Sequence, residues 1–229
     1  MGQAIEKIAL SRGHKISARI DANPADWNAI SASNTDVAIE FSIPDKATEN
    51  IKKCIELGIP VLSGTTGWLS YKPMLDQLAT SKGVPFFYAS NYSLGVNLFF
   101  KLNQYLAKLL SPYPQYQVSM EEIHHTQKKD APSGTAITLA EGILENLKSK
   151  TAWALAGEGK PSHEEIVIAS KRIDPYPGQH TVTYHSSVDD IEIRHTAHSR
   201  EGFALGAVLV AEWLPTQKGV LGMDDFLKL

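Results

Sequence analysis

The sequence predicts an α/β protein built from two domains, and three of its features carry this prediction. Strand and helix patterns alternate through short loops up to Ala89, which is typical of a parallel sheet covered on both faces. After Asn91 strands predominate, and some show the period-two alternation of a half-covered sheet. With 229 residues and 43% hydrophobic side chains, the chain can bury one large core or two modest ones.

The first half of the chain contains the alternating elements. Gly13 is placed to end the first helix, Pro44 to stop the second strand, and Gly58 to follow the second helix as its C′ residue. Helices are expected at residues 4–10, 45–57 and 73–80, and strands at 16–21, 37–42, 59–63 and 84–89.

The second half opens with a long apolar helix and then turns to strands. Helices are expected at residues 94–110, 136–147 and 203–214, and strands at 117–123, 165–169, 181–185 and 191–195. The change of pattern places the domain boundary near residues 91–94. We expect a dinucleotide-binding domain of residues 1–92 and about 203–229, and a second domain of residues 93–202.

Composition excludes several classes of protein. A net charge of -3 gives no reason to expect nucleic acid or an anionic membrane as a partner, and no apolar run is long enough to span a bilayer. The one cysteine, Cys54, lies in a helical pattern and allows no intrachain disulfide. With no signal peptide at the front, we expect a cytoplasmic protein.

The segment from Glu121 to Ala136 carries the most chemical information. His124 and His125 follow a predicted strand, and Lys128 comes four positions after His124. Alone, such a histidine pair is more often structural, and a zinc site is disfavoured because no cysteine or third histidine stands at ligand spacing. We therefore expect no metal. Two imidazoles and an ammonium beside an anion site favour acid–base work on an anionic substrate.

That anion site is the start of the helix that follows. Asp130 or Ser133 can cap it, and Pro132 suits its first turn. Gly134 lets a ligand approach the backbone, and Thr135 offers a hydroxyl. Free N–H groups at such a helix start favour a carboxylate.

This segment resembles the signature of the dihydrodipicolinate reductases, which carry His-His, a Lys, and then Asp-Ala-Pro-Ser-Gly-Thr-Ala. The likeness covers nearly the whole chain. It includes the Gly64-Thr65-Thr66-Gly67 loop over the nicotinamide, the hinge from Ala89 to Asn97, and the substrate-domain matches Pro177-Gly178, His180-Thr181-Val182 and Ser199-Arg200.

The resemblance implies a Rossmann-like nucleotide-binding domain plus an α+β domain for substrate binding and oligomerisation, with a mainly open mixed sheet. It implies reduction of 4-hydroxy-tetrahydrodipicolinate by NADH or NADPH in lysine and diaminopimelate biosynthesis, by a homotetramer. His124 is then the general acid/base and Lys128 the proton donor. The implied ligands of the dicarboxylate substrate are His125, Lys128, Ser133, Gly134 and Thr135. The implied cofactor-binding residues are Gly2, Asp21, Gly64, Thr65, Thr66, Ala89, Ser90, Asn91 and Tyr92.

Asp21 leads us to expect a weak preference for NADH. An acid at the end of the second strand of a nucleotide-binding unit can hold a ribose hydroxyl and repel a 2′-phosphate. No arginine follows at positions 22 or 23, although Arg19 is near. Asp21 can equally be a turn residue before Asn23-Pro24.

The chain departs from the family pattern at its front. A dinucleotide-binding unit opens with a strand, a Gly-x-Gly-x-x-Gly turn and a helix, whereas here Met1-Gly2 runs directly into the helix. Gly2 resembles the last of these glycines. We expect the first strand and the first two glycines to be absent, and we favour a start assigned too late over a shortened chain.

Two alternatives stay open. One is another two-domain, nicotinamide-dependent amino-acid dehydrogenase, which shares the first domain but gives no account of residues 124–135. The other is a shortened, weakly active or inactive paralogue that binds the dicarboxylate or a partner.

Overall fold

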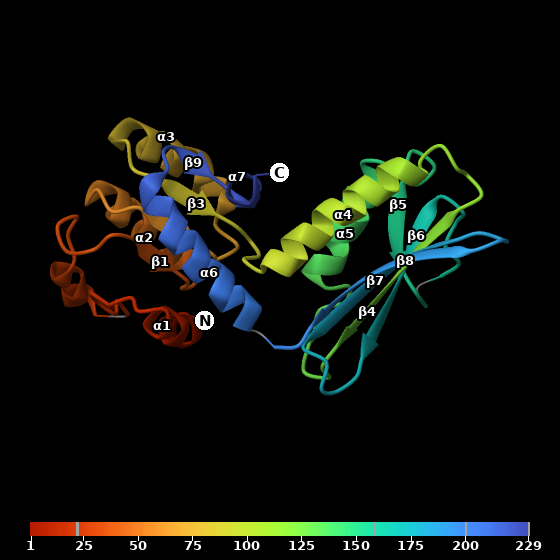
Figure 1. Ribbon diagram of the computed structural model, residues 1–229, viewed down its shortest axis with the longest axis horizontal. Coiled ribbons are helices and arrows are strands. Elements are labelled where there is room, and N and C mark those ends of the chain that lie inside the picture. Colours follow the sequence, from red (N-terminus) through yellow and green to blue (C-terminus); the bar gives the residue numbers. More distant parts are fainter. Residues whose placement is uncertain (22, 158, 200, 229) are drawn as a thin grey trace. The chain divides into compact units, whose positions relative to one another are not determined.

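The protein is described by a computed structural model that covers residues 1–21, 23–157, 159–199 and 201–228. It forms two compact units, one of Met1–Leu94 with Glu201–Leu229 and one of Gly95–Arg200 (Figure 1). The predicted α/β fold is confirmed, because one unit has a parallel sheet between helices and the other a mixed sheet.

The sheet of the first unit is parallel throughout. Its strands run in the order β1-β2-β3-β9, and they are β1 (Ala38–Glu40), β2 (Val61–Ser63), β3 (Phe86–Tyr88) and β9 (Val220–Leu221). Neighbouring strands of a parallel sheet end at the same edge, so the loops after β2 and β3 emerge side by side.

Helices cover both faces of this sheet because successive strand residues point to opposite sides. Leu62 and Phe87 pack in one core with α1 and α6, whereas Val61 and Phe86 pack in another with α2 and α3. The helices of this unit are α1 (Gly2–Ser11), α2 (Pro44–Glu56), α3 (Lys72–Lys82), α6 (Glu201–Trp213) and α7 (Met223–Leu227), with short 3-10 helices at Pro24–Ala29, Leu69–Tyr71 and Leu214–Thr216.

The strand predicted at residues 16–21 is wrong. In the described chain this segment joins neither sheet, and β1 is paired on one side only, with β2. Ile16 nevertheless packs against the core between α1 and α6, and Arg19 donates from Nε to Glu6 of α1 at 2.9 Å. The segment is therefore anchored by one partly buried apolar side chain and one ion pair, but it lacks the neighbouring strand whose backbone hydrogen bonds would make it part of a sheet.

The second unit has one five-stranded mixed sheet in the order β5-β6-β4-β7-β8. The central strand β4 runs parallel to β6 and antiparallel to β7. Figure 1 shows helices α4 (Leu94–Leu110) and α5 (Gly134–Leu144) beside this sheet, and their apolar residues share its core. The strands are β4 (Gln117–His124), β5 (Ala152–Leu155), β6 (Glu165–Arg172), β7 (Gly178–His185) and β8 (Asp190–Ala197).

Candidate active site

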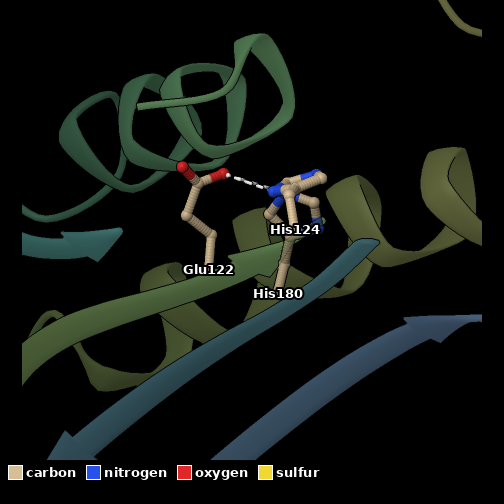
Figure 2. Close-up of side chains that lie close together, drawn as sticks. All are labelled: Glu122, His124 and His180. Atoms are coloured by element: carbon tan, nitrogen blue, oxygen red, sulfur yellow. Dashed lines mark ion pairs between the residues drawn. The ribbon is translucent and has the colours of Figure 1, made fainter. Parts of the chain in front are cut away.

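The pleat of β4 places Glu122 and His124 on the same face of the sheet, two residues apart. The antiparallel register sets Glu122 directly opposite His180 on β7. All three side chains are buried, and Glu122 has no exposed surface. Figure 2 shows the Glu122 carboxylate directed toward the two imidazoles.

One carboxylate oxygen of Glu122 faces both rings. Its Oε2 lies 3.2 Å from Nδ1 of His124 and 3.7 Å from Nε2 of His180. The two rings meet edge-on, with centroids 5.1 Å apart. Neither Oε2 nor His124 Nδ1 makes a well-aligned hydrogen bond with any described residue, so the two atoms are in close contact and a small rotation would align them.

The other oxygen, Oε1, accepts two donors. The backbone N–H of Ser133 donates to it at 3.1 Å, and Nη2 of Arg172 at 3.2 Å. Burial raises the pKa of Glu122, but donors from His124, His180 and Ser133 outweigh it and hold the pKa well below its usual range. Glu122 is therefore a buried anion at neutral pH.

Burial makes His180 harder to protonate than a histidine on the surface. Burial lowers its pKa, and nearby Glu122 offsets this only in part. Its Nε2 lies 3.1 Å from the hydroxyl oxygen of Ser133. A neutral His180 thus links the carboxylate to the helix start.

Ser133 caps α5, since its hydroxyl accepts the backbone N–H of Ala136 at 3.2 Å. Of the two caps considered, Asp130 instead pairs with Lys128, whose Nζ lies 2.8 Å from Oδ2. The prediction that Pro132 occupies the first turn is wrong, because it precedes the cap. It follows a cis peptide bond from Ala131.

The start of α5 is open to a ligand. Gly134 is exposed, and a Cβ built on it would meet no atom within 4 Å. Thr135, the next residue, is half-buried. Lys128, in the preceding loop, and His125, directly after β4, are half-buried as well. Accessible N–H groups, a hydroxyl and an ammonium therefore lie in one segment whose other end is His124.

Arg172 was missed by sequence reasoning, and so were the roles of Glu122 and His180. Arg172 donates from Nη2 to the carbonyl of Asp130 at 2.5 Å and from Nε to that of Lys128 at 3.3 Å. No local motif marks a partner on another strand. A signal was present in β4 and β7, where Glu122 and His180 fall at inward positions of alternating strands.

The loops proposed for the cofactor leave the sheet of the first unit at its carboxyl edge, where nucleotides bind in open α/β sheets. The loop after β2 needs glycine at 64, because a Cβ there would stand 2.2 Å from the ring of Phe41. Gly67 has a φ of 85°, which also favours glycine. Thr66 and Ser90 are exposed at this edge.

Hydrogen bonds with the buried side chains of Glu40 and Tyr92 fix the backbone and side chains of the loop after β2. Glu40 is buried and accepts hydroxyl donors from Ser63 at 2.7 Å and Thr65 at 3.1 Å. The hydroxyl of Tyr92 donates to the carbonyl of Ser63 at 2.8 Å. Ala89 is buried and Asn91 half-buried in the loop after β3, and Asn91 accepts the backbone N–H of Ser93.

Gly2 and Asp21, the other two residues predicted to bind the cofactor, lie outside the loops that follow β2 and β3. Gly2 is the first residue of α1, exposed, with nothing within 4 Å of a Cβ built on it. The expectation that Asp21 ends a strand is wrong; it is an exposed bend residue whose N–H lies 3.5 Å from Asp26 Oδ2. Ala22, and Arg200 of the Ser199-Arg200 match, lie outside the described residues.

Glu122, His124 and His180 could also be considered as metal ligands. One ligand atom from each lies within 4.8 Å of the others. However, Arg172 is already bound to the same carboxylate, and the cation opposes a second positive charge. Oε1 is thus already hydrogen-bonded by Ser133 and Arg172, and Oε2 faces both imidazoles.

Comparison with known proteins covers both units. A family model described as the N-terminus of dihydrodipicolinate reductase matches residues 1–92, and one described as its C-terminus matches residues 95–227. A 4-hydroxy-tetrahydrodipicolinate reductase of Christiangramia forsetii is 48% identical over 99% of this chain and 93% of its own. One of Archaeoglobus fulgidus is 35% identical over 100% of this chain and 96% of its own.

Solved structures share the fold. A dipicolinate-bound dihydrodipicolinate reductase from Paenisporosarcina sp. TG-14 superposes with a TM-score of 0.77 at 21% identity, covering 96% of this chain and 92% of that one. An amine dehydrogenase from Mycobacterium smegmatis has a TM-score of 0.59 at 10% identity, with 96% and 91% covered. Among the described residues, no helix is long and apolar enough to cross a membrane.

Proposed function

We propose that this chain, which belongs to the dihydrodipicolinate reductase family, reduces 4-hydroxy-tetrahydrodipicolinate to tetrahydrodipicolinate with a nicotinamide cofactor. The observation that carries the proposal is the pairing of His124 with the buried anion Glu122 beside the open start of α5. An imidazole held by a carboxylate is suited to proton exchange, and a free helix start to a carboxylate ligand.

The substrate residues divide the work by chemistry. Backbone N–H groups at Gly134 and Thr135 and the Thr135 hydroxyl would bind one carboxylate, and His125 and Lys128 would contribute positive charge or hydrogen bonds to the substrate. Ser133 acts differently, because its hydroxyl and N–H are committed to the cap and to Glu122; its contribution is to shape the helix start. When substrate binds, Lys128 would break its ion pair with Asp130 and form one with a substrate carboxylate.

Proton handling falls to His124 and Lys128. Loss of the 4-hydroxyl as water leaves a conjugated ring; the nicotinamide supplies a hydride to that ring when bound, and the ring takes one proton from elsewhere. Lys128 would deliver that proton from Nζ, and His124 would act as general acid/base through Nε2 while Nδ1 faces Glu122.

The first unit fits a dinucleotide. The edge of its sheet offers exposed Thr66 and Ser90 next to glycines at 64 and 67, and the start of α1 at Gly2 is open with no acid in its first turn. Helix starts of this kind favour phosphate. Gly64, Thr65, Thr66, Ala89, Ser90, Asn91 and Tyr92 would form the nicotinamide end, with Gly2 and Asp21 toward the pyrophosphate and ribose.

The proposal is tested by adding 4-hydroxy-tetrahydrodipicolinate to the purified chain with NADH or NADPH and following cofactor oxidation, with aspartate and homoserine oxidation by the oxidised cofactors as controls. We expect turnover only with the cyclic substrate. Tight dicarboxylate binding without turnover would favour the inactive paralogue, and oxidation of an amino acid would favour the other dehydrogenase.

Further features of the working protein are proposed with it. The sheet face away from α4 and α5 carries exposed polar residues such as Ser119, Glu192 and Arg194, and it would form the interfaces of a homotetramer, which light scattering would measure. A single buried thiol, Cys54, is in keeping with the reducing cytoplasm.

A further inference from the structure

We propose that Glu122 is a positioning residue, which fixes the tautomer of His124 and holds the loop of Lys128 through Arg172. This rests on the proposed function, since it concerns how the acid–base groups of that site are kept in place. Glu122 has no exposed surface, so it would not touch substrate or cofactor.

The tautomer follows from the charge of the carboxylate. An ionised Glu122 can only accept hydrogen bonds, so the atom of His124 that faces it, Nδ1 at 3.2 Å, must carry a proton. The other ring nitrogen, Nε2, is then the atom that gains and loses a proton. It lies beside Gly178, where a Cβ would stand 3.1 Å from it.

The other carboxylate oxygen of Glu122, Oε1, holds, through Arg172, the loop that contains Lys128. Arg172 donates from Nη2 both to Glu122 Oε1 and to the carbonyl of Asp130, and from Nε to the carbonyl of Lys128. Oε1 also accepts the backbone N–H of Ser133. A single buried charge therefore connects His124, the backbone of the Lys128 loop and the cap of α5.

The chain contains a matched control for this arrangement. Glu121 and Lys171, the neighbours of Glu122 and Arg172 on the same two strands, form an ion pair of 2.5 Å on the opposite face of the sheet. Their side chains are 35% and 51% exposed, against 0% and 21% for Glu122 and Arg172. The exposed pair has the same charges and nearly the same backbone setting, but its side chains lie on the face of the sheet away from His124 and Glu122.

The experiment compares Glu122→Gln with Glu121→Gln, with kcat, substrate KM and the tautomer of His124 by 15N NMR as readouts. The glutamine amide can donate to Nδ1 and so favours the other tautomer. Where an amide replaces such a carboxylate, kcat falls by up to about 10⁴-fold with the geometry intact. We expect kcat of Glu122→Gln to fall at least about 10²-fold, and Glu121→Gln, shown by light scattering to assemble as wild type does, to stay within about twofold of wild type.

Arg172→Lys against Lys171→Arg tests the loop. Lysine keeps the charge but loses the planar fork that reaches three carbonyls and the carboxylate. We expect substrate KM to rise about tenfold in Arg172→Lys and to change little in Lys171→Arg. Equal effects in the two variants would contradict the role of Arg172.

The tautomer is measured on the free wild-type protein, so it stands whether or not the variants fold and whatever the substrate proves to be. A proton on Nδ1 of neutral His124 supports the proposal, and a proton on Nε2 instead overturns it. A folded Glu122→Gln protein with kcat within threefold of wild type would overturn it as well. Failure of the wild type to reduce the cyclic substrate would instead overturn the proposed function.

Discussion

Two buried glutamates, one in each unit, hold the loops of their own units in different ways. Glu40 ends β1 and accepts from neutral donors, namely the hydroxyls of Ser42, Ser63 and Thr65 and the N–H of Ser42 at 3.0 Å. Glu122 is surrounded by two imidazoles, a guanidinium and one N–H. Both carboxylates are buried, but among the described residues the hydrogen-bond partners of Glu40 are hydroxyls and a backbone N–H, whereas Glu122 faces two imidazoles.

This difference separates shape from proton chemistry. Hydroxyl and amide donors to Glu40 keep their protons at any working pH, so they can only fix the form of the loop at residues 64–67. An imidazole, unlike a hydroxyl or an amide, is a group that enzymes use to exchange protons. We infer that Glu40 supports cofactor binding and that Glu122 supports the chemical step.

The largest effect is expected at His124. His124→Gln keeps a polar side chain but removes the group that exchanges a proton, so kcat should fall by about 10²–10⁴-fold while substrate KM changes much less. Steady-state kinetics of the purified variant measure both. Near-normal turnover would remove His124 from the acid–base role and with it the contrast between the two units.

Lys128→Ala should come next, because this residue is proposed both to bind the substrate and to deliver a proton. We expect kcat to fall and KM to rise together, with a combined loss of about 10²–10³-fold in kcat/KM. A change confined to KM would leave Lys128 as a binding residue only.

Thr135→Ala removes a single hydroxyl contact at the start of α5. Binding of the dicarboxylate should weaken by about 0.5–3 kcal/mol, with kcat at saturation little changed. Calorimetry with dipicolinate as a non-reacting probe gives the affinity directly. Unchanged binding would mean that this helix end holds no carboxylate.

In the first unit, Glu40→Gln tests the comparison of the two glutamates. The amide keeps only one of the two acceptor oxygens that Ser63 and Thr65 use, so the loop at residues 64–67 should loosen, at a cost of about 1 kcal/mol. NADH affinity should fall about fivefold in a fluorescence titration. A fall in kcat as large as that in Glu122→Gln would show that the two carboxylates are not functionally distinct.

The smallest effect concerns cofactor choice. Asp21 is exposed and would repel a 2′-phosphate, so kcat/KM should be a few-fold higher with NADH than with NADPH, and Asp21→Asn should reduce that ratio. An equal or better value for NADPH in the wild type would argue against this role of Asp21.

The sequence predicted long, strongly patterned elements best. The helix at residues 94–110 agrees with α4 because its apolar side chains recur at helical spacing over the whole segment. The strand at 16–21 failed because pattern does not reveal whether a ladder partner is present. Strand β5, with four half-buried residues, and the two-residue strand β9 have too little pattern to be found.

The same limit applies to the candidate site. Local motifs identified His124, Lys128 and the start of α5, because those residues are close in sequence. His180 and Arg172 lie about fifty residues farther along and reach Glu122 only through the pairing of β4 with β7 and β6. Such partners are set by strand register, which one sequence does not specify.

The contrast between the two glutamates is tested most directly by the rate of a single turnover at saturating cofactor and substrate. Under these conditions weakened binding does not contribute, and only the chemical step is measured. We predict that Glu122→Gln slows this step at least about 10²-fold and that Glu40→Gln leaves it within about threefold of wild type. Similar rates for the two variants, or a slower step in Glu40→Gln, would contradict the account.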